Sequence, residues 1–115
     1  MGSKGRGGRV QYQPGAGSML KQVQQLQAQM AKAQEELASE TVSATVGGGA
    51  VTVVVTGQQE VRSVQITPEV IDASDVEMLQ DLIVAAMNEG LTKSRELAEK
   101  KMAPLTGALN VPGLT

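Results

Sequence analysis

Aromatic side chains are almost absent from this chain of 115 residues, which has a single tyrosine, Tyr12, and no phenylalanine or tryptophan. Aromatic residues normally supply the largest buried areas of a protein core. The apolar residues here are mainly Val, Leu, Ala and Met, so a lone protomer would have a thin core. Small domains with weak cores are often completed by oligomerisation. The composition therefore predicts a single domain that forms a homodimer.

Cysteine and histidine are missing altogether. Their absence excludes disulfides and most zinc sites, and it removes the residues most often used as nucleophile or as general acid and base near neutral pH. No apolar run approaches the roughly 20 residues that span a bilayer, and residues 1–18 lack the apolar segment of a secretory signal. We therefore expect a soluble cytoplasmic protein with no metal, cofactor, small-molecule substrate or membrane partner.

Positive charge is scarce, with 10 basic residues against 12 acidic ones and a net charge of −2. Three of the basic residues, Lys4, Arg6 and Arg9, lie in residues 1–18, which contain no acid. Residues 19–115 contain the other seven basic residues and all 12 acidic ones, so their net charge is −5. Because phosphate contacts require Lys and Arg, nucleic-acid binding by the folded part would depend on local groups of basic residues.

Residues 1–18 are rich in glycine and have no hydrophobic period. They predict a disordered Gly/Arg-rich tail that precedes a single domain at residues 19–115. The GRGGR stretch resembles arginine-glycine segments that bind nucleic acid loosely. The alternative interpretation is a solvated leader without a binding role.

Two long helices are predicted at the ends of the domain. Residues 19–40 contain no Gly or Pro, and their apolar residues follow a heptad seam that should pack on another helix. This seam consists of Met19, Val23, Leu26, Met30, Ala33 and Leu37. The second helix should follow an S-x-x-E capping box at residues 74–77 and run to about Met102, before Pro104 stops it. Its seam consists of Val76, Leu79, Ile83, Ala86, Gly90 and Leu97.

Between the helices, β-branched residues predict a three-stranded antiparallel meander at residues 41–46, 50–56 and 60–66. The runs GGG at 47–49 and GQQ at 57–59 are the turns, and Pro68 begins a short helical turn. Val51, Val53 and Val55 share one face of the middle strand and Val54 lies on the other, which indicates partial burial of both faces. The predicted class is α+β, with a long N-terminal helix, a three-stranded antiparallel sheet and a long C-terminal helix.

No catalytic arrangement emerges from the sequence. The glycine run at 47–49 lacks the G-K-[ST] continuation and the following helix of a phosphate-binding loop. Glu35 with Glu36, and Asp72 with Asp75, are candidate carboxylate pairs, but no nucleophile or cation is placed beside them. The two aspartates are better explained by a turn and a helix N-terminus, where negative charge is favourable. The sequence therefore predicts a binding protein rather than an enzyme.

Basic residues on the helices are the candidates for binding. Lys21 and Lys32 lie on the first helix, and four more lie within nine residues near the end of the second: Lys93, Arg95, Lys100 and Lys101. At 3.6 residues per turn, Lys93, Lys100 and Lys101 fall in one broad sector, whereas Arg95 points elsewhere. The alternative interpretation is a solvated helix face with ion pairs such as Glu96 to Lys100.

Three segments in order resemble the YbaB/EbfC family of bacterial nucleoid-associated proteins. They are MLKQVQQLQAQMAKAQEELA, GGGAVTVVVTGQQEVRSVQITPEVI and DVEMLQDLIVAAMNEGLTKSRELAEKKM. The resemblance covers residues 19–115. It is specific, because G-x-V-x-V-x-x-x-G and I-x-P-E-V occur in this order between two long helices.

The resemblance implies a protomer that dimerises through its sheet region, with projecting helical arms that bind DNA with weak sequence preference. It implies a role in nucleoid organisation and gene expression, and DNA contacts at the basic arm residues Lys21, Lys32, Lys93, Arg95, Lys100 and Lys101. The tail residues Lys4, Arg6 and Arg9 are added as candidates for phosphate contacts. The alternative function is a protein-interaction or chaperone-like adaptor, which would lack the steep salt dependence of phosphate binding.

Overall fold

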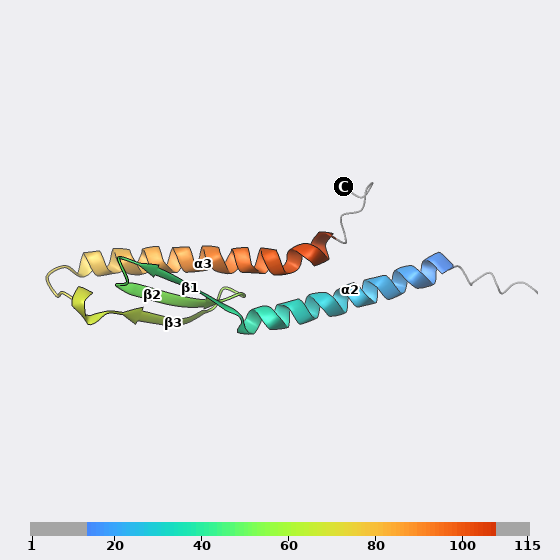
Figure 1. The fold of residues 1–115 in the computed structure, drawn as a ribbon, viewed down its shortest axis with the longest axis horizontal. Helices are drawn as coiled ribbons and strands as arrows, with labels where there is room; N and C mark the ends of the chain where they lie inside the picture. The colour runs from blue at the N-terminus through green and yellow to red at the C-terminus, as the bar shows by residue number, and fades with distance from the viewer. Residues whose placement is uncertain (1–13, 108–115) are drawn as a thin grey trace, which may run out of the picture.

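The computed structural model describes residues 14–107 and confirms the predicted α+β class. Its elements are helix α2 (Pro14–Ser39), strands β1 (Thr41–Val46), β2 (Val51–Thr56) and β3 (Val61–Ile66), the 3-10 turn η2 (Pro68–Val70) and helix α3 (Val76–Gly107). Helix α3 runs along one face of the sheet, whereas α2 leads away from the sheet (Figure 1). Within residues 14–107, neither helix has an apolar stretch long enough to cross a membrane.

The sheet is an antiparallel meander in the order β1-β2-β3. Between β1 and β2, Gly47, Gly48 and Gly49 all have positive φ, at 65°, 67° and 100°. Residues with a side chain rarely adopt this region. A Cβ on Gly47 would also lie 2.9 Å from a methyl group of Leu82 on α3. The glycine run therefore forms a tight turn that fits against the helix, as the sequence predicts.

The core lies between α3 and the first two strands. Val51, Val53 and Val55 are completely buried on the face of β2 that α3 covers. Gly90 of α3 lies directly above them, since a Cβ at this position would be 2.8 Å from Val53 Cγ2 and 2.9 Å from Val55 Cγ2. Gly90 therefore permits a close approach of helix and sheet. The buried face of α3 continues from Gly90 to Ser94, which is fully buried.

Strand β3 is not covered in the same way, because α3 packs over β1 and β2. Val64 pairs with Val53 and Val61 pairs with Val55, so both valines point to the face on which α3 lies. They nevertheless remain 39% and 40% exposed. On the opposite face, Val54 is half-buried. The protomer thus leaves an apolar strip along β3.

The heptad seam of α2 is buried only toward its C-terminal end. Ala33 and Leu37 are buried, with Leu37 only 1% exposed, whereas Met19 is 63% and Val23 49% exposed. The expectation that the whole stripe packs on another helix is therefore wrong for the protomer. Helix α2 meets α3 and β2 through its last turns, and its first half extends beyond them (Figure 1).

Both helix starts differ from the expected positions. Helix α2 begins at Pro14 rather than Met19, because proline suits the first turn of a helix. The cap of α3 is Asp75, whose Oδ1 accepts a hydrogen bond from the Met78 backbone N–H at 3.2 Å. The expected cap, Ser74, instead donates its hydroxyl to Asp72 Oδ1 at 2.7 Å. The remainder of the predicted tail, residues 1–13, lies outside the described residues.

Helix α3 continues through Pro104 to Gly107, so the expectation that proline stops it is wrong. Proline has no backbone N–H, so residue 104 cannot donate to the carbonyl of Lys100, its partner in an α-helix. The helix nevertheless continues for one more turn, in which the Thr106 hydroxyl donates to the carbonyls of Met102 and Ala103 at 3.1 and 3.2 Å.

Candidate nucleic-acid interface

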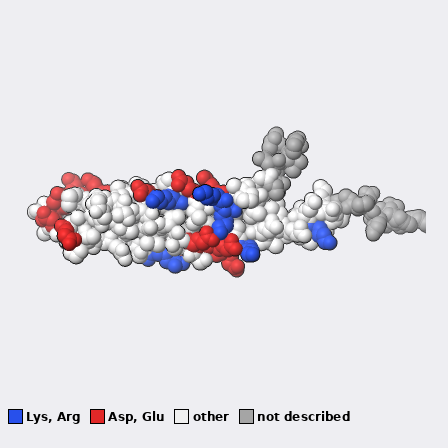
Figure 2. All heavy atoms as spheres, viewed as in Figure 1, with Lys and Arg blue, Asp and Glu red and all other residues white. Residues whose placement is uncertain are grey.

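Charge is unevenly distributed over the described residues. Acidic residues gather where η2 leads into α3, with no basic residue among them: Glu69, Asp72, Asp75, Glu77 and Asp81. In the view of Figure 2, red side chains cover this end without any blue ones, whereas blue side chains lie over the middle of the molecule, with red ones beside them, and along α2. Attraction to a polyanion is therefore expected at the arms, at a distance from the acidic end.

Lys93 and Lys100 lie together on the side of α3 that faces β1. They line one open groove of about 310 Å³, together with Val42, Glu96 and Leu97. Their placement agrees with the sector that the helical period predicts for these two residues. The groove combines two cations with a single carboxylate and is open to solvent.

Lys93 is held against the sheet. Its Nζ donates to the Ser43 carbonyl of β1 at 3.1 Å and lies 3.8 Å from Glu89 Oε2. Within residues 14–107, this i,i+4 ion pair forms instead of the expected pair between Glu96 and Lys100. Of the two lysines, Lys100 is therefore the more available for contact with a phosphate group.

Lys101 points to α2 rather than to the groove. Its Nζ donates to Glu36 Oε1 at 3.2 Å and to the carboxylate of Glu40. The hydrogen bond with Glu40 is the main cause that raises the pKa of Lys101, and Glu36 adds to it against an opposing effect of desolvation. The sequence placed Lys101 beside Lys100, but consecutive helical residues are about 100° apart. Lys101 joins the two helices and is not a free phosphate ligand.

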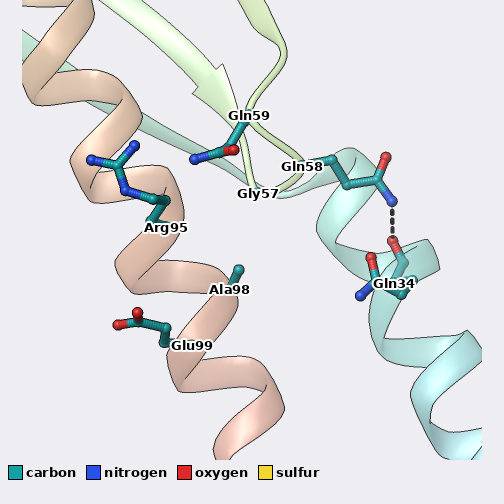
Figure 3. Close-up of a pocket in the computed structure, with 7 residues that line it drawn as sticks. All are labelled: Gln34, Gly57, Gln58, Gln59, Arg95, Ala98 and Glu99. Atoms are coloured by element: carbon teal, nitrogen blue, oxygen red, sulfur yellow. Dashed lines mark hydrogen bonds between the residues drawn. The ribbon is translucent and has the colours of Figure 1, made fainter.

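Arg95 lies on another side of α3, as predicted, and lines a cleft of about 460 Å³. The lining residues are Gln34, Gly57, Gln58, Gln59, Arg95, Ala98 and Glu99, shown in Figure 3. One guanidinium nitrogen of Arg95 donates to Thr92 Oγ1 at 3.2 Å. The sequence does not single out these glutamines as site residues. Its only signal was the GQQ turn, which was interpreted as a connection between strands.

The two lysines of α2 lie apart from each other. Lys21 lies near the start of the helix beside Leu20 and Gln24, and Lys32 lies beside Gln29 and Leu105 near the end of α3. At 1.5 Å per residue, the two positions are about 16 Å apart along the helix. The tail candidates Lys4, Arg6 and Arg9 lie outside the described residues.

Several other charged groups have structural roles. Arg62, which the sequence analysis did not single out, donates to the Ala38 carbonyl at the end of α2 at 3.2 Å, where a cation is favourable. The backbone N–H of Ser74, and then its hydroxyl, lower the pKa of Asp72. Asp72 thus holds the turn while Asp75 caps α3, as expected for a turn and a helix N-terminus rather than an acid–base pair.

Comparisons with known proteins identify the family of this chain and proteins similar to it. A profile of the YbaB/EbfC DNA-binding family matches residues 13–109. A protein named nucleoid-associated protein from Syntrophobacter fumaroxidans is 57% identical over 95 residues, covering 83% of this chain and 86% of the relative. One of the same name from Alkaliphilus metalliredigens is 50% identical over 101 residues, covering 88% and 89%. In fold, the chain resembles an uncharacterized protein of Helicobacter pylori, with a TM-score of 0.67, 19% identity, and coverage of 76% of this chain and 92% of that one.

Proposed function

Because this chain belongs to the YbaB/EbfC DNA-binding family, we propose that it is a nucleoid-associated protein that binds DNA as a homodimer. Binding depends mainly on phosphate contacts and takes place in the nucleoid, within the cytoplasm, where it influences nucleoid organisation and gene expression. The observation that carries this proposal is the placement of the basic residues: those of residues 14–107 all lie outside the acidic end, and six of the seven lie on the two helices, where glutamates are interspersed with them. The protein acts by binding and is not an enzyme.

The uncovered strip on β3 supports the dimer. Val61 and Val64 are exposed beside α3, and β3 is an edge strand with unpaired backbone groups. A second copy placed on this strip buries both valines. The side chains of Val51, Val53 and Val55 are not available to this interface, because the protomer's own α3 already covers them.

Sedimentation equilibrium of the full chain tests this assembly. The wild type should have the mass of a dimer, and Val64→Lys should shift it toward the monomer because it places a charge in the apolar strip. Ile71→Lys is the matched control, since Ile71 is an exposed apolar residue away from β3. A wild-type monomer at micromolar concentration, or a dimer that Val64→Lys leaves intact, would contradict the proposed interface.

The phosphate contacts are assigned to Lys100 and Lys93 in the groove beside β1, and to Lys21 and Lys32 on α2. Two protomers present each set twice, so a duplex held between the arms meets several cations while the acidic ends stay distant. Such contacts position the DNA without reading its sequence. Each phosphate neutralised contributes about 0.9 to the slope of log affinity against log salt concentration.

A charge-matched pair of variants tests the arms in mobility-shift titrations at two salt concentrations. Lys93→Gln with Lys100→Gln should weaken binding to every duplex alike and lower the salt slope. Ala73→Glu with Gln80→Glu changes the net charge equally on exposed residues at the acidic end, and it should change binding much less. Equal effects of the two variants would show that net charge, rather than the groove, controls binding.

A second candidate function follows from the exposed apolar residues on the first half of α2, Met19, Leu20 and Val23. They would suit a protein-interaction adaptor that binds clients through its arms. Salt distinguishes the two functions, because phosphate binding weakens steeply with salt and apolar contacts do not. DNA binding that is absent at low salt would favour the adaptor.

A further inference from the structure

The turn between β2 and β3 presents two adjacent glutamines, Gln58 and Gln59. Gln59 has a φ of 64° and is the one non-glycine residue with positive φ within residues 14–107. A residue with positive φ commonly ends the three-residue loop of a β-hairpin, and Gln59 occupies that position, with its backbone N–H bonded to the Thr56 carbonyl at 3.0 Å. The Gln59 side chain is exposed, and among the described residues its carboxamide makes no hydrogen bond.

The turn is held rigidly by two fully buried hydroxyl residues, Thr56 and Ser94. Ser94 Oγ donates to the Thr56 carbonyl at 2.6 Å and accepts from the Gln59 backbone N–H at 3.1 Å. Thr56 Oγ1 accepts from the backbone N–H groups of Gln58 and Glu60, both at 3.2 Å. This network fixes the turn to α3, so the two glutamine side chains project from a preorganised backbone.

Three elements converge on the cleft beside this turn. In Figure 3, Gln59 points from the turn toward Arg95 of α3, and Gln58 points toward α2. The Gln58 amide donates to the Gln34 carbonyl at 2.9 Å, which leaves its carbonyl oxygen available. The cleft volume of about 460 Å³ is within the range of small-ligand sites.

The lining side chains offer both donors and acceptors. The carboxamides of Gln58 and Gln59 offer both kinds of group, Arg95 donates, and the carboxylate of Glu99 accepts. A phosphate group fits this set poorly, because a phosphate is anionic and would be repelled by the carboxylate of Glu99. Nucleobase edges carry donors and acceptors side by side, and Gln and Arg are the residues that pair with adenine and guanine edges.

We propose that this cleft is a base-contacting subsite in which Gln58, Gln59 and Arg95 bind the hydrogen-bonding edge of a nucleobase. The inference rests on the proposed DNA binding and adds a base preference to lysine contacts that carry none. The base edge is presented either in a groove of a duplex or by an unpaired strand, and the cleft chemistry is the same for both.

Gln59→Gly tests the subsite without weakening the fold. Glycine accepts the positive φ, so this variant should unfold at a temperature no lower than the wild type. The probes are unpaired oligo-dA, oligo-dC and oligo-dT and duplexes of contrasting composition, with affinities measured by fluorescence anisotropy. The wild type should bind probes of different base composition with different affinities, either among the unpaired oligonucleotides or among the duplexes. Gln59→Gly should reduce the ratio of these affinities by about fivefold or more. Gln80→Ala, which removes an exposed glutamine near the start of α3 and outside the cleft, should leave the discrimination unchanged.

Arg95→Met separates base contact from phosphate contact. A base contact predicts losses that differ among probes, whereas a phosphate contact predicts equal losses and a salt slope lower by about 0.9. Equal losses for Arg95→Met, a wild type without base preference, or a Gln59→Gly variant with wild-type discrimination would each overturn the subsite while leaving DNA binding intact. A wild type that binds none of the probes at low salt would instead overturn the proposed function.

Discussion

The two long helices have similar apolar seams but differ in how the protomer uses them. Helix α3 places Ala86, Gly90 and Ser94 against the sheet, and all three are buried. Over residues 17–39, helix α2 buries only Ala33 and Leu37, near its end. A heptad seam therefore shows which face of a helix is apolar, whereas coverage of that face depends on what the rest of the chain places beside it. The uncovered part of α2 is available to partners, and the covered part of α3 sets the stability of the protomer.

The largest expected effect concerns the anchor of α2. Leu37→Ala should lower the free energy of unfolding by about 2–5 kcal/mol, because Leu37 is buried and its truncation leaves a cavity. Leu20→Ala, on the exposed half of the same helix, should change it by less than about 0.5 kcal/mol. Chemical denaturation of both variants measures the contrast. Similar losses would mean that the first half of α2 is covered in solution, as in an assembly that includes the arms.

The next effect concerns the polar contact of α3 with the turn. Ser94→Ala should lower the free energy of unfolding by about 0.5–1.5 kcal/mol, because it removes one of the two donors to the buried Thr56 carbonyl, the other being the Gln59 backbone N–H. Thr92→Ala removes a hydroxyl from an exposed position of the same helix and should have a small effect. If urea unfolding midpoints of the two variants coincide, the Ser94 network does not hold the turn.

Smaller effects on stability are expected from alanine substitutions at two glycines, and the two effects should have opposite signs. Gly90→Ala should destabilise by about 1 kcal/mol net, because overpacking against the stiff side chains of Val53 and Val55 exceeds the gain in helix propensity. Gly17→Ala in α2 meets nothing within 4 Å and should stabilise by up to about 1 kcal/mol. Thermal unfolding gives both signs. Stabilisation by Gly90→Ala would show that α3 can move away from the sheet at little cost.

The sequence predicts the elements well because their signals are local. The valine alternation of β2 and the glycine turn at 47–49 depend on neighbouring residues, and the structure confirms both. Helix ends were less predictable, since Ser74 and Asp75 are both plausible caps and the choice depends on the turn formed with Asp72. The relation between the helices was not predictable, because the partners of Lys101 are more than 60 residues away along the chain.

The same separation limited the prediction of the candidate site. The basic residues of the arms are visible as charges in the sequence, but their availability depends on contacts from other elements. Lys93 meets Ser43 of β1, and Lys101 meets acids of α2. The cleft joins α2, the GQQ turn and α3, which the sequence places far apart. The role of each residue depends on its distance from other groups in space, and this distance cannot be read from the spacing of residues along the chain.

The smallest expected effect concerns the ion pairs that join the two helices. Glu40, and after it Glu36, raise the pKa of Lys101 above its ordinary 10.5. A raised pKa in the folded state means that the stabilisation is fully present below pH 10.5 and is lost as pH rises through the higher folded value. The wild type should therefore unfold at a slightly higher temperature than Lys101→Met near neutral pH, and the difference should disappear in strong alkali. Lys32→Met is the control, since Lys32 forms no ion pair within residues 14–107. A difference that persists unchanged in alkali would assign the effect to packing of the lysine stem rather than to its charge.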